Sequence, residues 1–467
     1  MQISKEKIYG WSQTTSDSSN IFYIQSKKDL FKVIDLAKNE EMKISNIGSG
    51  RSYGDNFLND EISISYSKFN KILNYDIKNK KITLEPGATI DSILRTTLSD
   101  GLMFPVMPGI RYASVGGCLS NNVHGKNVRK KNYFGNHVKS LKVILSDGRD
   151  LSCDRTNNAE LFFSIISGLG LIGFIYEVTL NLEEIETYFV DQFQIKNKGI
   201  NNLIDEYTNL IDKCDFSLAM VDNSSIFSKN EGYKLTYCNY SKKITKLKLD
   251  QHDVKTFMFG IIPKAMVPFI LKFPFMKYLM YQFLGFWSSG VIGYFKKMTV
   301  SLSDYNFQFD QTLPKYNYFF KKGLIEYHCM VPKNLFEDFY NKSISEMKKL
   351  KLKTVFTSIK YYQNSGENFL LSFEPAEDSL GLSIHFDNKN KDLIDTYIDF
   401  LNKLILEYNG KIYFAKNINI NKSQLIKMYP NYGKFVDMKT KYDKEDLITS
   451  NLYKRIFLEV DKYRGKY

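Results

Sequence analysis

Residues 108–127 read PGIRYASVGGCLSNNVHGKN, and this glycine-rich stretch, which follows an apolar run, decides the fold. Gly116 and Gly117 allow the backbone to lie flat against a ligand, because glycine has no Cβ. Ser114 and Asn121 supply neutral hydrogen-bonding groups beside them. The cationic residues that follow favour an anion nearby: Lys126, Arg129, Lys130 and Lys131. The stretch therefore predicts a ligand-binding loop.

Two further glycine turns occur in the same part of the chain, GSGRSYGD at 48–55 and SGLGLIGF at 167–174. The glycines of the first turn allow positive φ, so that consecutive N–H groups can point at one phosphate. The second turn, taken alone, is typical of a helix C-cap. Three such turns indicate a dinucleotide laid across several loops. The spacing is not GxGxxG and lacks the acidic residue expected downstream, which argues against NAD on a Rossmann fold.

The hydrophobic pattern up to residue 184 is α+β, with a helix opened by Ser26 and Asp29 and a hairpin turning at Asp147-Gly148. Beyond residue 185 glycines become rarer and long amphipathic helices appear at 334–350 and 392–410. Strands at 323–332 and 380–387 lie between these helices. The pattern predicts a second α+β domain, an antiparallel sheet with helices on one face.

Composition and charge narrow the class of protein. The 467 residues are 43% hydrophobic and 25% charged, which is typical of a globular chain. Of the net charge of +13, most comes from residues 101–150 and 251–300. No zinc-finger spacing, RNP motif or basic helical stripe accompanies this charge, so anionic cofactors and anionic membranes are better candidates than nucleic acid. Five scattered Cys without a CxxC pair argue against a zinc site, and the start of the chain shows no secretory signal, so we expect a cytoplasmic protein.

One aromatic and basic segment, residues 257–297, stands apart. Its uncharged run from Tyr278 to Phe295 is diluted by Gln, Ser and Gly, which argues against a transmembrane helix. Lys264, Lys272 and Lys277 punctuate the aromatic residues, as in a segment that lies in a membrane interface. A buried core helix and a disordered loop over the active site remain open alternatives.

The three glycine motifs, together with FGNHV (134–138) and IYFAKN (412–417), resemble the vanillyl-alcohol-oxidase (PCMH-type) flavoproteins along essentially the whole chain. The resemblance implies a two-subdomain FAD-binding domain that is discontinuous (1–184 and 411–467) and a substrate domain at 185–410. Arg51 occupies the position where many relatives attach flavin through His, which implies non-covalent FAD. The residues that this resemblance assigns to the cofactor are Gly48, Ser49, Gly50, Arg51, Ser52, Tyr53, Gly54, Pro108, Gly109, Ser114, Gly116, Gly117, Asn121, Val123, His124, Gly125, Gly170, Gly173, Ile175 and Tyr413.

The resemblance also implies the reaction. Lys416 matches a lysine in front of the flavin, where a cation stabilises a developing alkoxide, and Tyr53 is assigned with it to catalysis. The residues assigned to the substrate are His124, Lys360, His385, Glu326 and His328, of which the last three depart from the closest members of the family. Those members oxidise a polyprenyl-phosphate-linked pentose to a keto sugar, and a separate NAD(P)H-dependent reductase completes an epimerisation.

Three functions remain open at this point. The first is this lipid-linked sugar oxidase, in peripheral contact with the inner face of the membrane. The second is a soluble alditol or sugar-lactone oxidase, whose His-x-Trp-x-Lys pattern near the C-terminus is lacking here, since no Trp follows Trp287. The third is a basic nucleic-acid- or membrane-binding protein without catalysis.

Overall fold

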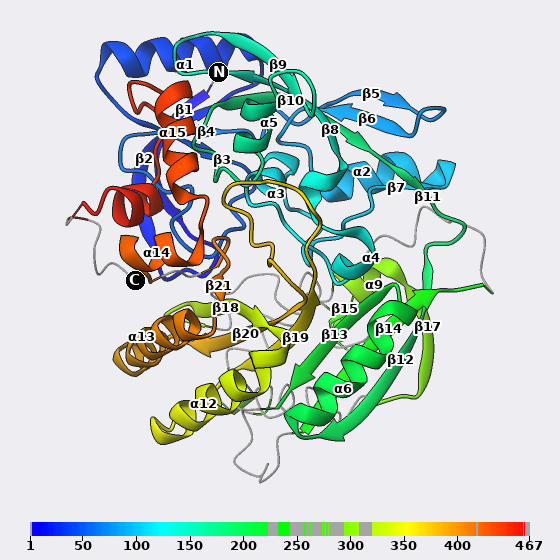
Figure 1. Ribbon diagram of the computed structural model, residues 1–467. Helices are drawn as coiled ribbons and strands as arrows, with labels where there is room; N and C mark the ends of the chain where they lie inside the picture. Colours follow the sequence, from blue (N-terminus) through cyan, green and yellow to red (C-terminus); the bar gives the residue numbers. More distant parts are fainter. Residues whose placement is uncertain are drawn as a thin grey trace.

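The computed structural model describes residues 2–222, 232–242, 294–307, 320–416, 419–460 and 462, together with 256–257, 262–263, 273, 275–276 and 279. Two small sheets lie in the upper half of the molecule in Figure 1 and one large sheet lies in the lower half.

The first small sheet has the strand order β1-β2-β4-β3. Its strands are β1 (Gln2–Tyr9), β2 (Ser16–Tyr23), β4 (Ile62–Ser65) and β3 (Ile44–Ile47). Helix α1 (Lys27–Asn39) connects β2 to β3, and it opens with the expected capping box of Ser26 and Asp29. Strand β4 runs parallel to both β2 and β3. The helix expected after Ser26 thus joins two parallel strands of one sheet as a βαβ unit.

The second small sheet is antiparallel, in the order β5-β6-β10-β8-β9. Its strands are β5 (Ile72–Asp76), β6 (Lys81–Leu84), β10 (Phe174–Asn181), β8 (Val138–Ile144) and β9 (Asp150–Asp154). The accompanying helices are α2 (Ile90–Thr97), α3 (Val115–Ser120), α4 (Val128–Lys131) and α5 (Ala159–Ile165), and β7 (Leu102–Met103) pairs with β11 (Glu183–Glu184). The predicted hairpin is β8 and β9, with Gly148 at φ +86°.

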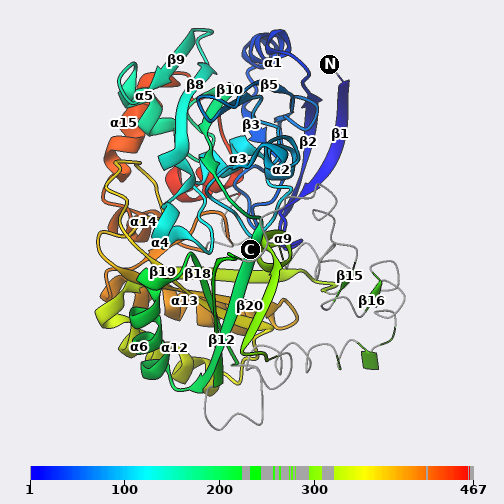
Figure 2. The ribbon, with the colours of Figure 1, turned by 90° about the vertical axis from the view of Figure 1, so that its right-hand side faces the viewer.

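The large sheet has eight strands in the order β17-β12-β14-β13-β19-β20-β18-β21 and is antiparallel throughout. Its strands are β17 (Lys297–Ser301), β12 (Phe189–Lys198), β14 (Gly232–Tyr240), β13 (Phe216–Val221), β19 (Phe356–Tyr362), β20 (Ser379–Asp387), β18 (Leu324–Pro332) and β21 (Lys411–Ile412). Figures 1 and 2 place α6 (Ile200–Leu210), α12 (Phe336–Lys349) and α13 (Lys391–Glu407) together on one side of it, while α9 (Leu302–Asn306) follows β17. The predicted antiparallel sheet with helices on one face is confirmed.

The alternation of side chains along this sheet creates its two faces. On β18, Tyr327 points to the helices, where its hydroxyl donates to Asn402 Oδ1 of α13 at 3.1 Å. Its neighbours Glu326 and His328 point to the opposite face, where they line a cavity. That face turns toward the N-terminal sheets.

The last part of the chain, with α14 (Lys422–Met428) and α15 (Tyr432–Tyr442), returns to the N-terminal sheets. The buried Arg455 Nη2 lies 3.1 Å from Asp55 Oδ1, and Ile448 forms a parallel bridge with Ile44 of β3. These contacts accord with a discontinuous domain, although the boundaries at 184, 185, 410 and 411 stay predictions.

Across the described ranges, no helix combines the length and apolar character that a membrane crossing requires. The aromatic and basic segment 257–297 falls mostly outside the described residues, so its predicted membrane contact is not tested here.

Candidate active site

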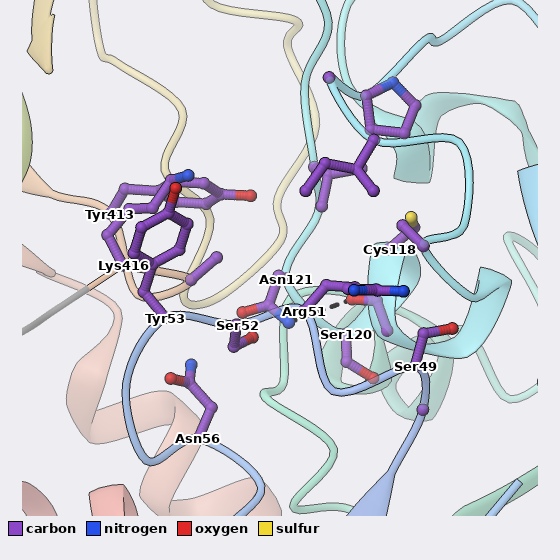
Figure 3. Close-up of a pocket in the computed structure, with 18 of the residues that line it drawn as sticks. Ser49, Arg51, Ser52, Tyr53, Asn56, Cys118, Ser120, Asn121, Tyr413 and Lys416 are labelled. Atoms are coloured by element: carbon purple, nitrogen blue, oxygen red, sulfur yellow. Dashed lines mark hydrogen bonds between the residues drawn. The ribbon is translucent and has the colours of Figure 1, made fainter. Parts of the chain in front are cut away.

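A cavity lies where the three glycine turns meet the open face of the large sheet. Figure 3 shows part of its lining, with Arg51, Asn121 and Lys416 labelled. Strands β13, β18, β19 and β20 contribute its sheet wall. Every residue that the sequence assigned to cofactor, substrate or catalysis lines this cavity, with one exception. The exception is Gly54, whose carbonyl oxygen instead faces Gly10, where a Cβ would come within 2.7 Å of it.

The first glycine turn, residues 48–54, follows β3 and is held against Ser114. The Ser49 N–H donates to Ser114 Oγ at 3.0 Å, and a Cβ on Gly48 would lie only 2.2 Å from the same oxygen. Gly50 has φ +61°, which favours glycine. The close approach of this turn to Ser114 therefore depends on its glycines.

Arg51 brings a cation to this part of the wall. Its guanidinium carbon lies 4.0 Å from the centroid of the Trp11 ring, a cation–π contact. The backbone N–H of Trp11 donates to the Ser52 carbonyl at 2.8 Å, which holds this part of the chain beside the loop. Arg51 is thus oriented where the anionic part of a ligand can approach the turn.

The second and third turns also come close to neighbouring backbone. A Cβ on Gly116 would lie 3.0 Å from the Pro86 side chain, and the Gly116 N–H donates to the Pro86 carbonyl at 2.8 Å. Gly170 has φ +74°, and its carbonyl accepts from Asn46 Nδ2 at 2.9 Å. All three turns thus bring backbone to the cavity.

Of the four cations expected around the second turn, only Lys126 lines the cavity. Its Nζ donates to the carbonyls of Tyr305 at 2.7 Å and Asn306 at 3.2 Å. Burial and the nearby Lys360 lower the pKa of Lys126 to about 7. The other three bind Asp212 and Asp378 (Arg129), the Asp212 carbonyl (Lys130) and Glu183 (Lys131). The expectation of four cations beside the ligand is wrong, because two of them pair with acidic side chains elsewhere and one donates to a backbone carbonyl.

The sheet end of the cavity contains a buried carboxylate, Glu326, which is 4% exposed. Its Oε2 accepts from Lys416 Nζ at 2.7 Å and lies 3.2 Å from His385 Nε2, and its Oε1 accepts from Ser383 Oγ at 2.8 Å. The register pairs Glu326 of β18 with His385 of β20. Burial raises the pKa of Glu326, but Lys416 and His385 outweigh burial and hold the pKa well below its usual range. Glu326 is therefore anionic.

Lys416 reaches this carboxylate from a turn, although the side chains of IYFAKN favour a strand. Strand β21 ends at Ile412, and the Tyr53 N–H binds the Ala415 carbonyl at 2.9 Å, so contacts with the first glycine turn replace sheet pairing. Lys416 Nζ lies 4.3 Å from the centroid of the Tyr53 ring. Figure 3 shows Tyr53, Tyr413 and Lys416 grouped on one side of the cavity.

His385 is stacked on Phe356, a residue that the sequence analysis missed, with ring centroids 3.7 Å apart. Burial lowers the pKa of His385 and outweighs the opposing effect of Glu326. His385 is therefore neutral. Its Nε2–H donates a hydrogen bond to Glu326, and Lys416 is the cation that pairs with this carboxylate.

Two further histidines meet at Tyr362, another residue that was missed. The Tyr362 hydroxyl lies 2.9 Å from His124 Nε2 and 3.0 Å from His328 Nε2. Tyr362 follows Lys360 by two positions on β19, so strand alternation would have placed it on the same face. Tyr413 packs beside both histidines, with ring centroids 5.0 Å from His124 and 5.6 Å from His328.

Lys360 lines the cavity between these groups. Burial, and then the charge of Lys416, lower its pKa to about 8, so it is mostly cationic at neutral pH. Among the described residues that line this end, the groups that can be charged near neutral pH are three lysines (Lys126, Lys360 and Lys416) and the carboxylate of Glu326. The arrangement favours an anionic ligand.

Comparisons with known proteins agree with this geometry. Residues 19–154 match the family described as "FAD binding domain", and residues 324–456 match "D-arabinono-1,4-lactone oxidase". The chain is 23% identical to decaprenylphosphoryl-beta-D-ribose oxidase of Mycolicibacterium smegmatis, over 97% of this chain and 98% of the relative. It is 21% identical to L-gulonolactone oxidase of Mus musculus, over 96% of this chain and 97% of the relative.

The fold, the cavity and these matches define an FAD-dependent oxidoreductase that acts on CH–OH groups. The chain has an FAD-binding domain at residues 19–154 and resembles the vanillyl-alcohol-oxidase (PCMH-type) flavoproteins along its length.

The residues at the glycine-rich end fit FAD. A Cβ on Gly109 would meet no atom within 4 Å, so the wall has room for a flat ring system there. Among the described residues, Asn56 Oδ1 and Asn121 Oδ1 are buried without a hydrogen-bond partner, and both side chains line the cavity (Figure 3). Such amide oxygens can accept from ligand hydroxyls, while Arg51 suits a pyrophosphate.

Proposed function

We propose that this enzyme oxidises a secondary alcohol on a polyprenyl-phosphate-linked pentose to the ketone. The observation that carries the proposal is the Lys416–Glu326–His385 cluster at the sheet end of the cavity, where an anionic carboxylate holds the Lys416 cation. Lys360 adds a positive charge that suits the phosphodiester of the substrate. Similarity to the Mycolicibacterium smegmatis relative along the whole chain supports this substrate class.

Bound FAD supplies the hydride acceptor in this reaction. Lys416 stabilises the negative charge that develops on the sugar oxygen as its carbon is oxidised. The hydroxyl proton passes to Lys416 as Lys416 releases one of its own protons to water, and the Glu326 carboxylate, which stays anionic, orients this ammonium group. Tyr53, whose ring lies against the ammonium group, holds Lys416 in place.

Anaerobic bleaching of the flavin absorption tests this function. A prenylphosphoryl-β-D-ribose should bleach the enzyme within one turnover, whereas sorbitol and L-gulono-1,4-lactone should not. Bleaching by the free alditol or the lactone alone would overturn the proposal in favour of a soluble sugar oxidase.

The alternative of an alditol or sugar-lactone oxidase has its own support. The lactone-oxidase family matches residues 324–456, and the mouse L-gulonolactone oxidase is similar along 96% of the chain. The His-x-Trp-x-Lys pattern of such oxidases, aligned on Lys416, meets Ile412 and Phe414 here. This difference favours the lipid-linked sugar.

We further propose that the FAD is not covalently attached. Arg51 stands where many relatives have the linking histidine, and its guanidinium is stacked on Trp11. Acid precipitation should therefore leave a colourless pellet and a yellow supernatant. A flavin that stays with the pellet after washing would contradict this attachment.

The keto sugar would be reduced by a separate NAD(P)H-dependent reductase, which completes an epimerisation at the inner face of the cell membrane. Membrane contact is assigned to the segment 257–297 from its composition. Replacing Lys264, Lys272 and Lys277 by Ser should weaken flotation with anionic vesicles, because ammonium groups contribute about 1 kcal/mol each near such a surface. The flavin spectrum should be unchanged, and unchanged flotation would contradict the assignment.

A further inference from the structure

Tyr362 joins two histidines that come from distant parts of the chain. His124 lies in the second glycine turn and His328 on β18, and both ring Nε2 atoms are within 3.0 Å of the same hydroxyl. Tyr362 is fully buried, while His124 and His328 are 7% and 2% exposed. The two imidazole centroids are 5.7 Å apart, and their planes are nearly perpendicular.

The number of polar hydrogens on the two imidazole rings and the phenol limits how the three groups can hydrogen-bond. Burial lowers the pKa of both histidines well below the usual 6.5. The charge of Lys360 lowers the pKa of His124 further, and the opposing charge of Glu326 does not outweigh burial at His328. Each neutral ring therefore has one N–H and one lone pair. The phenol has a single O–H, so both contacts are satisfied when it donates to one Nε2 and accepts from the other.

We infer that Tyr362 fixes His124 and His328 in opposite tautomers, so that their Nδ1 atoms present one donor and one acceptor to a ligand in the cavity. The ring whose Nε2 accepts has its hydrogen on Nδ1, and the ring whose Nε2 donates has a lone pair on Nδ1. Within the described part of the chain, both Nδ1 atoms are buried and lack a hydrogen-bond partner. Because both residues line the cavity, a bound molecule completes these bonds.

A ligand that matches this pair has a hydrogen-bond donor and a hydrogen-bond acceptor next to each other. Two groups in the proposed reaction have it, the hydroxyls of the sugar and the N–H/C=O edge of the isoalloxazine ring. Tyr362 is thus a positioning residue, since it acts through the histidines. The assignment of tautomers does not depend on the proposed substrate. Only the experiment below that adds the lipid-linked sugar rests on the proposed function.

Nitrogen NMR of the FAD-loaded enzyme with ¹⁵N-labelled histidine tests the tautomers directly. The chain has five His, so the signals of His124 and His328 can be identified by their loss in H124Q and H328Q. One residue should show an Nδ1–H pattern and the other an Nε2–H pattern. The same tautomer at both positions overturns the inference without the need for any Tyr362 variant.

The ligand is then identified by the two arms of a titration. A shift of the Nδ1 signals on adding prenylphosphoryl-β-D-ribose identifies the sugar hydroxyls. Nδ1 signals that move on loading FAD, and stay in place with the sugar, identify the flavin edge. Nδ1 signals that respond to neither ligand overturn the binding role.

Tyr362→Phe provides the kinetic test, with Tyr361→Phe as its matched control. Tyr361 is the next residue of β19, and its hydroxyl donates to Asp378 Oδ2 at 2.7 Å, away from the histidines. Loss of one buried hydrogen-bonding hydroxyl should lower kcat/KM by about tenfold in Tyr362→Phe, with FAD content and circular dichroism unchanged. Tyr361→Phe should stay within about twofold of wild type.

A double-mutant cycle distinguishes a tautomer role from simple packing. If Tyr362 acts through the histidine pair, adding Y362F to H328Q should change kcat/KM by less than about twofold, since the coupling has already gone. Independent, multiplicative losses would overturn the inference.

Discussion

The two halves of the cavity are built on different principles. The half formed by residues 48–54, 108–125 and 170–175 consists of glycine backbone and neutral side chains, with Arg51 as its cation. The half formed by the large sheet, with the turn that carries Lys416, presents lysines, histidines and a glutamate at strand positions fixed by register. Binding a large flat cofactor needs shape and space, whereas proton and charge transfer need ionisable groups at set distances. Each half can therefore be disturbed separately.

The largest expected effect is loss of the cofactor through the glycine half. A Cβ on Gly117 would lie 3.1 Å from Ser114 Oγ, and the further methyl groups of valine would occupy the cavity that Gly117 lines. Gly117→Val should therefore purify without FAD, as measured by absorbance at 450 nm against protein. Gly433→Val on α15, where a Cβ meets nothing within 4 Å, is the control and should keep its flavin. Full flavin content in Gly117→Val would show that this turn does not contact the cofactor.

The next effect falls on the sheet half and should spare the cofactor. Lys416→Ala removes the cation beside the reacting oxygen, so flavin reduction by prenylphosphoryl-β-D-ribose should slow by roughly a hundredfold in stopped flow, with FAD content unchanged. Lys416→Arg should not fully restore the rate, because a guanidinium does not exchange a proton as an ammonium does. Lys427→Ala, an exposed lysine on α14, should reduce normally. A rate within a few-fold of wild type would falsify the role of Lys416.

A smaller effect concerns stability and its dependence on pH. The depressed pKa of Glu326 means that its carboxylate stabilises the folded enzyme above about pH 4.5, and that this contribution is lost as pH falls through the folded pKa. Glu326→Gln should lower the free energy of unfolding by about 1 to 2 kcal/mol at pH 7, less than for a fully buried pair because Lys416 is partly exposed.

Urea unfolding in excess FAD measures the difference in free energy of unfolding between wild type and Glu326→Gln. This difference should become smaller below about pH 4.5. The exposed Glu337→Gln on α12 should show no such trend. A gap between Glu326→Gln and wild type that is the same at pH 4 and pH 7 would contradict the ion-pair explanation.

The two halves also differ in how far the sequence could predict them. Gly50 and Gly116 could be predicted from the residues alone, because positive φ and close backbone approach are local requirements. The meeting of Glu326 with His385 depends on the pairing of β18 with β20, which no local pattern reveals, so only the family resemblance brought them together. Tyr362 was missed although the alternation from Lys360 points to it.

In the segment IYFAKN, by contrast, the local sequence pattern points to a structure that the chain does not adopt. Ile412, Tyr413 and Phe414 favour a strand by their side chains. In the structure, Asn56 Nδ2 binds the Phe414 carbonyl at 2.7 Å and the Tyr53 N–H binds that of Ala415 at 2.9 Å. Tertiary contacts thus override β propensity and place Lys416 in the cavity.

The buried ion pair between Asp55 and Arg455 has a consequence for biosynthesis. Asp55 adjoins the first glycine turn, yet its partner lies 400 residues further along the chain and leaves the ribosome long after the turn does. Until Arg455 emerges, burial of the Asp55 carboxylate is uncompensated, and the glycine turn that lines the cavity lacks its support. Nascent chains stalled before residue 455 should therefore fail to capture flavin, so cofactor loading waits until Arg455 has been synthesised.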